Sequence, residues 1–263
     1  MTEYVILQKI YGSGRQRCAE ALRQELRSFA AGLEVEMSLT GHTERGWARI
    51  EVRGDDEQVA CNYLRERFGL APESIEDIRS RSVVRGQAID AGRVGYGLYV
   101  DVGFAQTMPV DALIPLHTLR SQFADGCKVS THAILETYCI TDNFPLSLRV
   151  SRVDQTGTKI EAEFSDEQIS MFEHWFEDRL DRVLAFGIPR KEVDEALAAT
   201  QLRRYVVEVE ELGLFEHALL CKLGTDGVGV IARLGSSLRG IPLRVFSPFK
   251  ARALAGSPKI ILN

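Results

Sequence analysis

Two tyrosines three positions apart, Tyr96 and Tyr99, are the side chains best suited to contact a ligand. They flank Gly97 within residues 83–103, which read as a strand, a glycine-rich turn and a second strand. A glycine inside a strand pattern marks a bend or a close backbone approach. Aromatic rings on a bent, exposed strand offer flat surfaces for nucleotide bases, each worth ~1–3 kcal/mol. The pattern predicts an RNA-binding face; packing of the rings within the sheet is the alternative.

Basic residues before and after the tyrosines are candidates for phosphate contacts. Each one alone is typical of ordinary solvated surface, so the prediction depends on the set. Strands and loops of a small barrel would bring the set to one side. The candidates are Arg93, Arg120, Lys128, Arg149 and Arg152.

Two glycine-rich segments are weaker candidates. Gly12-Ser13-Gly14-Arg15 precedes a helical pattern, so its amides could hold an anion, although a tight turn explains it better. Residues 224–229, followed by Arg233, Arg239 and Arg244, combine glycine with positive charge. They form a second candidate for nucleic-acid contact, and a structural turn is again the simpler interpretation.

No local motif supports a catalytic triad, a Cys–His pair or paired carboxylates, so we expect no enzyme activity and no catalytic residues. The five cysteines are irregularly spaced without a C-x-x-C pair, and the five histidines are scattered. Free thiols in a reducing compartment are therefore expected, with no metal and no cofactor. An enzyme with its site between domains remains an alternative, which a deep interdomain pocket with convergent titratable groups would favour.

The elements that must position these residues fall into three groups. The first reads β-α-β-β-α: strands at residues 4–11, 33–39 and 47–52, helices at 15–30 and from 55 to Gly69. The second is mainly strand-like, with segments at 83–89, 98–102, 111–114, 128–140, 146–153 and 159–164, and a polar stretch around residues 115–125 that allows a single helical turn.

The third group begins with Ser165 as a helix cap and a helix that runs through Leu184 to a stop at Gly187. Phe172, Trp175 and Phe176 form a packing stripe on it. A second helix follows from Pro189 to about residue 199, then strands at 204–209, 218–223 and 243–246, with an ambiguous region at 225–238.

Composition and charge limit the function. The chain has 263 residues, 45% of them hydrophobic, and a net charge of −5. Residues 164–200 hold nine acidic against four basic side chains, whereas residues 201–263 hold five against nine. A protein that depended on phosphate contacts alone would be more basic, so RNA binding should be local or modest in affinity. No apolar run is long enough to span a bilayer and the N-terminus lacks signal-peptide features, which predicts a cytoplasmic protein without membrane contact.

From Arg85 onward the middle segment resembles the OB-fold RNA-binding module of the ribosomal-protein type. The matching stretches are Tyr96–Gly103 for its second strand, Asp111–Pro115 for its third, and Ala124–Val129 for the start of its fourth. The sequence Ala-Leu-Ile-Pro at residues 112–115 resembles the variant of this module in the transcription elongation factor NusA more than the commoner form. The resemblance implies that Tyr96 and Tyr99 lie on the binding face. In the commoner form a histidine at the place of Pro115 contributes to that face; here His117 lies two residues on.

The whole chain also resembles an archaeal protein family known only as uncharacterised, which implies an archaeal cytoplasmic origin and supplies no activity. The sequence predicts an α+β protein of three domains: a ferredoxin-like domain (1–76), an OB-type barrel (77–164), and a helical segment followed by a small α/β region (165–263). The predicted function is RNA binding in transcription, RNA processing or translation, as part of a ribonucleoprotein or transcription complex. The alternative is a protein-interaction module without direct RNA contact, in which the barrel and the acidic helix dock polypeptides.

Overall fold

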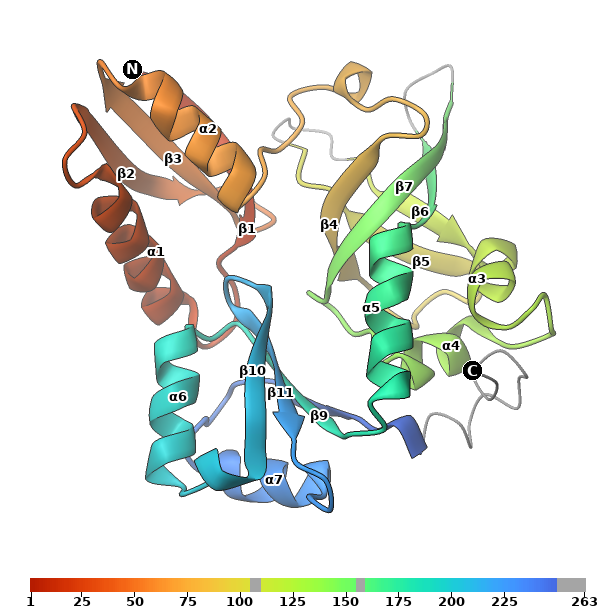
Figure 1. The fold of residues 1–263 in the computed structure, drawn as a ribbon. Coiled ribbons are helices and arrows are strands. Elements are labelled where there is room, and N and C mark those ends of the chain that lie inside the picture. The colour runs from red at the N-terminus through yellow and green to blue at the C-terminus, as the bar shows by residue number, and fades with distance from the viewer. Residues whose placement is uncertain (105–109, 155–158, 250–263) are drawn as a thin grey trace.

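A computed structural model describes residues 1–104, 110–154 and 159–249. The chain forms three parts that meet at the centre of the molecule (Figure 1). A helix-covered sheet comes first, a β-barrel second, and another helix-covered sheet third. No helix among the described residues is both long and apolar enough to cross a membrane.

The N-terminal part has the predicted β-α-β-β-α order. Its three strands pair antiparallel in the order β1-β3-β2. Its helix α1 buries Cys18, Leu22 and Leu26, which recur every four residues and so lie on one face. The elements are β1 (Thr2–Lys9), α1 (Arg15–Ala30), β2 (Val35–His42), β3 (Trp47–Gly54) and α2 (Glu57–Arg67).

The central part contains a closed five-stranded barrel, as the strand-rich pattern predicts. Its strands follow the order β4-β5-β6-β8-β7, and the barrel is closed by pairing of β7 with β4. Only the β6–β8 pair is parallel. After the short helix η1 (Ile75–Asp77), the elements are β4 (Val83–Ile89), β5 (Gly97–Asp101), β6 (Ala112–Pro115), α3 (Leu116–Phe123), α4 (Thr131–Thr137), β7 (Pro145–Val153) and β8 (Ile160–Phe164).

The predicted strand at 128–140 is wrong, because this segment contains helix α4. Ser130 caps the helix by accepting a hydrogen bond from the Ala133 amide at 3.2 Å. Ile134 and Tyr138 are buried one turn apart, which is the helical spacing. The resemblance of residues 124–129 to the start of a fourth strand therefore fails as well: the fourth strand of the barrel is β7.

The long helix predicted through Leu184 is also wrong. Helix α5 (Asp166–Glu177) ends early, and Arg179 has a left-handed φ of 57°, which a continuing helix does not allow. The next apolar run forms a strand, β9 (Arg182–Phe186), in which every residue is buried. The aromatic stripe itself is confirmed, since Phe172 and Trp175 on α5 are buried.

The C-terminal part is a four-stranded antiparallel sheet in the order β10-β11-β9-β12. The predicted helix after Pro189 is confirmed, and the ambiguous region contains a short helix, α7. Its remaining elements are α6 (Arg190–Ala199), η2 (Arg203–Tyr205), β10 (Val206–Gly213), β11 (Glu216–Cys221), α7 (Gly227–Leu234) and β12 (Leu243–Phe246). Residues 250–263 of the predicted C-terminal domain lie outside the described residues.

A continuous aromatic core joins the barrel to the C-terminal sheet. Trp175 of α5 lies 6.4 Å from Phe144 beside the barrel and 5.1 Å from Phe246 of β12, measured between ring centroids. Phe186 of β9 belongs to the same buried cluster. Burial of large apolar side chains is the main favourable term in folding, so these two parts share one core.

A buried ion pair joins the barrel to the N-terminal part. Lys9 Nζ lies 2.7 Å from Asp101 Oδ2, and the two side chains are only 4% and 2% exposed. Trp47 Nε1 donates to the same carboxylate oxygen at 3.0 Å, and the Gly103 amide donates to the other at 3.0 Å. Asp101 of the Val-Asp-Val-Gly stretch is thus a structural residue. It fixes the end of β5 against β1 and β3.

Candidate nucleic-acid interface

Tyr99 lies on the outside of the barrel in a row of aligned side chains. The strand register places it opposite Ile89 of β4 and Leu113 of β6, and its neighbours Leu98 and Val100 are buried. The row continues from Leu113 to Glu161 of β8 and from Glu161 to Arg152 of β7. We call this set, Ile89–Tyr99–Leu113–Glu161–Arg152, the outer row.

Tyr96 stands beside this row, in the turn just before β5. Its side chain is 56% exposed, and Tyr99 is partly exposed. The hydroxyl groups lie 2.9 Å apart, and the rings are perpendicular with centroids separated by 6.1 Å. The hydrogen bond with Tyr96 is the main cause of the raised pKa of Tyr99, so this ring is a neutral phenol near pH 7. The two rings support each other and neither is sealed inside the core.

Gly97 allows β5 to approach β6 beneath these rings. A side chain at this position would collide with the carbonyl oxygen of Ile114 on the neighbouring strand. The sequence-based interpretation of Gly97 as a site of close backbone approach is therefore confirmed.

Helices α3 and α4 both begin beside the turn that carries Tyr96. The Leu116 amide donates to the carbonyl of Tyr96 at 2.8 Å, and Thr131 Oγ1 donates to the carbonyl of Gly95 at 2.8 Å. His117, the second residue of α3, is exposed next to this contact. Tyr96, Tyr99 and His117 are thus gathered around one turn of the barrel.

The predicted basic residues are only partly brought together. Arg93 is in the same turn as Tyr96 and pairs with Asp90 at 2.6 Å, while Lys128 is exposed between α3 and α4. Arg152 is the last residue of the outer row. The other two are used structurally: Arg120 donates through Nε to the carbonyl of Val129 at 2.8 Å, and Arg149 pairs with Asp166 at the start of α5.

The other members of the outer row were not predicted from the sequence. Ile89 and Leu113 extend the apolar surface on both sides of Tyr99, and Glu161 places a carboxylate between Leu113 and Arg152. The alternation of buried and exposed positions along each strand assigns these residues to the outside, but their alignment depends on the barrel register.

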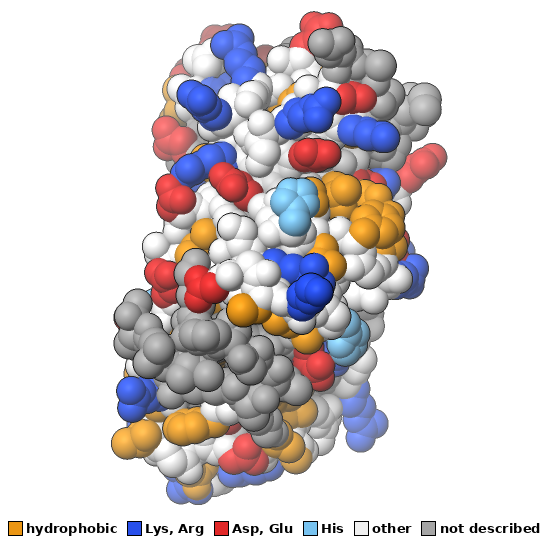
Figure 2. Space-filling view, turned by 90° about the vertical axis from the view of Figure 1, so that its right-hand side faces the viewer, with side chains coloured by type: hydrophobic (Ala, Val, Ile, Leu, Met, Phe, Trp, Pro, Cys, Tyr) orange, Lys and Arg blue, Asp and Glu red, His pale blue; other side chains and the backbone are white. Residues whose placement is uncertain are grey.

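Figure 2 shows acidic and basic side chains intermixed on the barrel side of the molecule, with a hydrophobic patch beside a histidine at mid-height. The basic side chains of the described residues do not form an unbroken field in this view. A nucleic-acid contact here would depend on ring stacking with a few cations.

Both glycine-rich segments serve packing and turns. A side chain at Gly14 would collide with the carbonyl oxygen of Gly187, so Gly12-Ser13-Gly14 lets the N-terminal part approach the turn after β9. In the second segment, Asp226 caps α7 by accepting from the Val228 and Gly229 amides, and Arg233 donates to the carbonyl of Thr200 at 2.7 Å.

The described residues thus define a mixed α/β protein of several domains around a closed five-stranded barrel. The chain belongs to the DUF2110 family, since three family models match it in succession. The N-terminal domain matches residues 3–74, the central domain residues 78–176 and the C-terminal domain residues 180–245. Among the curated proteins, none matches this sequence.

Proposed function

We propose that the protein binds RNA on the outside of the barrel, at the surface formed by Tyr96, Tyr99 and the outer row. It would act as an accessory protein in transcription, RNA processing or translation. The observation that carries the proposal is the exposed, hydrogen-bonded pair of tyrosine rings on the second strand of the barrel.

The topology supports this choice of surface. The five strands run in the order first-second-third-fifth-fourth, with helices between the third and fourth, and from this order we infer an OB-type barrel. OB barrels bind oligonucleotides on the face of the second and third strands and on the loop between the first two. In this chain those elements are β5, β6 and the turn with Arg93 and Tyr96. The resemblance of the sequence at residues 112–115 to the NusA variant agrees with an OB-type barrel that binds RNA on these strands.

The N-terminal part carries a second topological inference. Its β-α-β-β-α order makes most of a ferredoxin-like unit, in which a fourth strand would complete the sheet. Here the next strand, β4, belongs to the barrel. We therefore infer a ferredoxin-like unit that lacks its last strand and supports the barrel through Lys9 and Trp47.

Fluorescence anisotropy with labelled single-stranded RNA tests the proposal. Each stacked base is worth ~1–3 kcal/mol, so the double variant Tyr96→Ala/Tyr99→Ala should lose about tenfold or more in affinity. Phe249→Ala is the matched control, because Phe249 is a 67% exposed aromatic residue outside the barrel. Equal affinity of the double variant and the wild type would remove the proposed surface. Protein partners that survive nuclease treatment in a pull-down, without RNA binding, would favour the protein-interaction alternative.

A further inference from the structure

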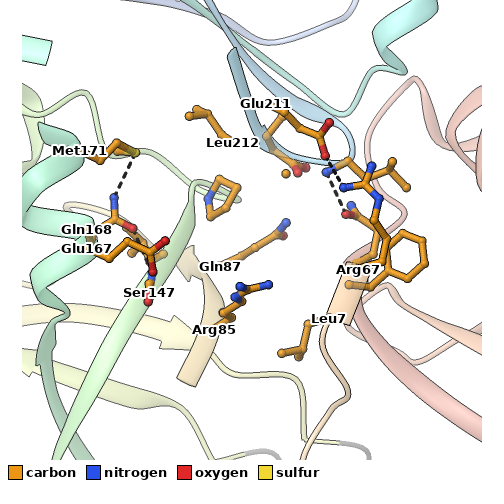
Figure 3. A pocket seen from close by; sticks show the side chains of 18 residues that line it. Leu7, Arg67, Arg85, Gln87, Ser147, Glu167, Gln168, Met171, Glu211 and Leu212 are labelled. Carbon is orange, nitrogen blue, oxygen red and sulfur yellow. Dashed lines mark hydrogen bonds and ion pairs between the residues drawn. The ribbon is translucent and has the colours of Figure 1, made fainter. Parts of the chain in front are cut away.

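A cavity of about 390 Å³ lies where the three parts of the chain meet. This volume is in the range of small-ligand sites. Its walls come from the end of β1, the end of α2, β4, β7, α5 and the β10–β11 hairpin. In Figure 3, Arg85 and Gln87 project from β4 into the space, Gln168 and Met171 come from α5, and Arg67 faces Glu211 across the other side. We call this cavity the interdomain cleft.

Three buried polar atoms with no hydrogen-bond partner line the interdomain cleft: Gln87 Oε1, Ser147 Oγ and Glu216 Oε2. Five such side-chain atoms occur in the described part of the chain, so most of them are concentrated here. Gln87 is 4% exposed and Glu216 is fully buried. A buried polar group without a partner costs ~1–3 kcal/mol, which makes three in one cavity a sign of a ligand contact.

The inner end of the cleft is close to neutral. Tyr11 donates its hydroxyl to Glu216 Oε1 at 2.6 Å, and burial raises the pKa of Glu216 to about 7. Near neutral pH this group is therefore partly a carboxylic acid, which can donate one hydrogen bond and accept another. Gln87 and Ser147 likewise provide uncharged donors and acceptors.

Of the charged side chains that line the cleft besides Glu216, Arg67 and Glu211 pair with each other, whereas Arg85 and Glu167 are exposed. Arg67 pairs with Glu25 at 2.8 Å and with Glu211 at 2.7 Å, so it adds little free charge. The N-terminal part, α5 and the β10–β11 hairpin add apolar lining from Leu7, Met171 and Leu212.

We propose that the interdomain cleft binds a nucleobase, with Gln87, Ser147 and Glu216 reading its uncharged hydrogen-bonding edge. A nucleobase combines a flat apolar ring with adjacent donors and acceptors, and a glutamine amide can pair with such an edge through two hydrogen bonds. Arg85 would contact a 5′-phosphate where one is present. The base can belong to a free nucleoside or to one nucleotide of an RNA. This proposal rests on the cleft alone and not on RNA binding at the barrel.

Calorimetric titration of the full chain with the four ribonucleosides and their 5′-monophosphates tests the site. We expect one nucleoside to bind with one-to-one stoichiometry, and its monophosphate to bind more tightly by a margin that Arg85→Ala removes. Gln87→Leu replaces an amide whose oxygen is unpaired with an apolar side chain of similar size, so it should weaken nucleoside binding at least tenfold without lowering the melting temperature. Ser147→Ala provides the same test if Gln87→Leu does not fold.

The variant Tyr96→Ala/Tyr99→Ala is the matched control and should bind the nucleoside like the wild type. Its behaviour separates this proposal from RNA binding on the barrel. Competition between the nucleoside and labelled RNA would assign the cleft to an RNA nucleotide, whereas simultaneous binding would assign it to a free nucleoside. Absence of binding for all eight compounds at millimolar concentration, or unchanged affinity in the folded Gln87→Leu or Ser147→Ala variant, would overturn the proposal.

Discussion

We call the barrel surface formed by Tyr96, Tyr99 and the outer row the tyrosine surface. It differs from the interdomain cleft in how the chain builds it. Tyr96, Tyr99 and His117 come from one stretch of 22 residues, and all three are at least partly exposed. The cleft brings Gln87, Ser147 and Glu216 together from two different parts of the molecule and buries them. A surface made by one segment leaves a motif in the sequence. A cavity made by several segments leaves none, and only unpaired polar atoms reveal it.

The largest effect should come from the ion pair that fixes the barrel to the N-terminal part and so supports both regions. Lys9→Met leaves Asp101 buried with Arg45 Nη1 at 3.6 Å as its remaining cation. Removing one partner of a buried pair should lower the free energy of unfolding by about 3 kcal/mol, which urea denaturation measures. Lys191→Met, in an exposed pair with Glu195, is the control and should change stability little. A loss below about 1 kcal/mol for Lys9→Met would mean that this contact does not hold the parts together.

Glu216 should make the free energy of unfolding of the protein depend on pH. Its pKa is about 7 in the folded chain, against 4.5 as the ordinary value, so the folded state binds its proton more tightly. The resulting stabilisation is complete below pH 4.5 and is lost as the pH rises through 7. The groups around Glu216 are Tyr11, Gln8 and Lys9 on the N-terminal side and the Phe215 amide on its own hairpin.

Glu216→Gln keeps an acceptor for Tyr11 and removes this titration. Between pH 5 and pH 8 the wild type should lose about 2–3 kcal/mol of unfolding free energy relative to the variant. Denaturation curves at the two pH values measure the difference. Parallel pH profiles for the two proteins would show that Glu216 is not a buried, partly protonated acid.

Two arginines on β7 allow a test of which part of the barrel contacts RNA. Arg152 belongs to the outer row, whereas Arg149 pairs with Asp166. Arg152→Ala should weaken single-stranded RNA binding severalfold and reduce the salt dependence of log K by about 0.7, the contribution of one phosphate contact. Arg149→Ala should leave both quantities nearly unchanged. Equal effects in anisotropy titrations over a salt series would show that the outer row does not define the surface.

The smallest effect is expected from the acidic member of the outer row. Glu161→Gln removes a carboxylate between Leu113 and Arg152, so RNA affinity should rise about two- to threefold at low salt and return to the wild-type value at high salt. Glu163→Gln, two residues further along β8 and opposite Arg149, is the control. A rise that persists at high salt would exclude an electrostatic cause.

Local hydrophobic periodicity was sufficient to predict many of the helices and strands. The helix at Arg15–Ala30 and the strand at Val83–Ile89 were predicted with their observed bounds, because apolar spacing and flanking glycines act within each segment. Residues 128–140 were wrongly predicted as a strand, because Val129, Thr131 and Ile134 are β-branched and favour strands. Burial of α4 against the barrel overrides that preference.

The candidate RNA-binding site could be predicted only where its residues lie close together in the sequence. The two tyrosines and Arg93 stand in one turn, and the sequence indicates them directly. Glu161 and Arg152 join the outer row through strand pairings across the barrel, which no local pattern specifies. The cleft lies between the parts of the molecule, and the titratable side chains of Arg85, Glu211 and Glu216 are among those that line it. It depends on how all three parts of the chain pack together, so no local sequence pattern could have identified it.

Ultraviolet crosslinking of single-stranded RNA to the full chain, with the modified residues mapped by mass spectrometry, tests RNA binding on the barrel most directly. The structure predicts crosslinks at Tyr96 and Tyr99, with loss of those adducts in the double alanine variant and persistence in Phe249→Ala. Crosslinks confined to the N-terminal or C-terminal part, or a yield that the double variant does not reduce, would contradict RNA binding at the tyrosine surface.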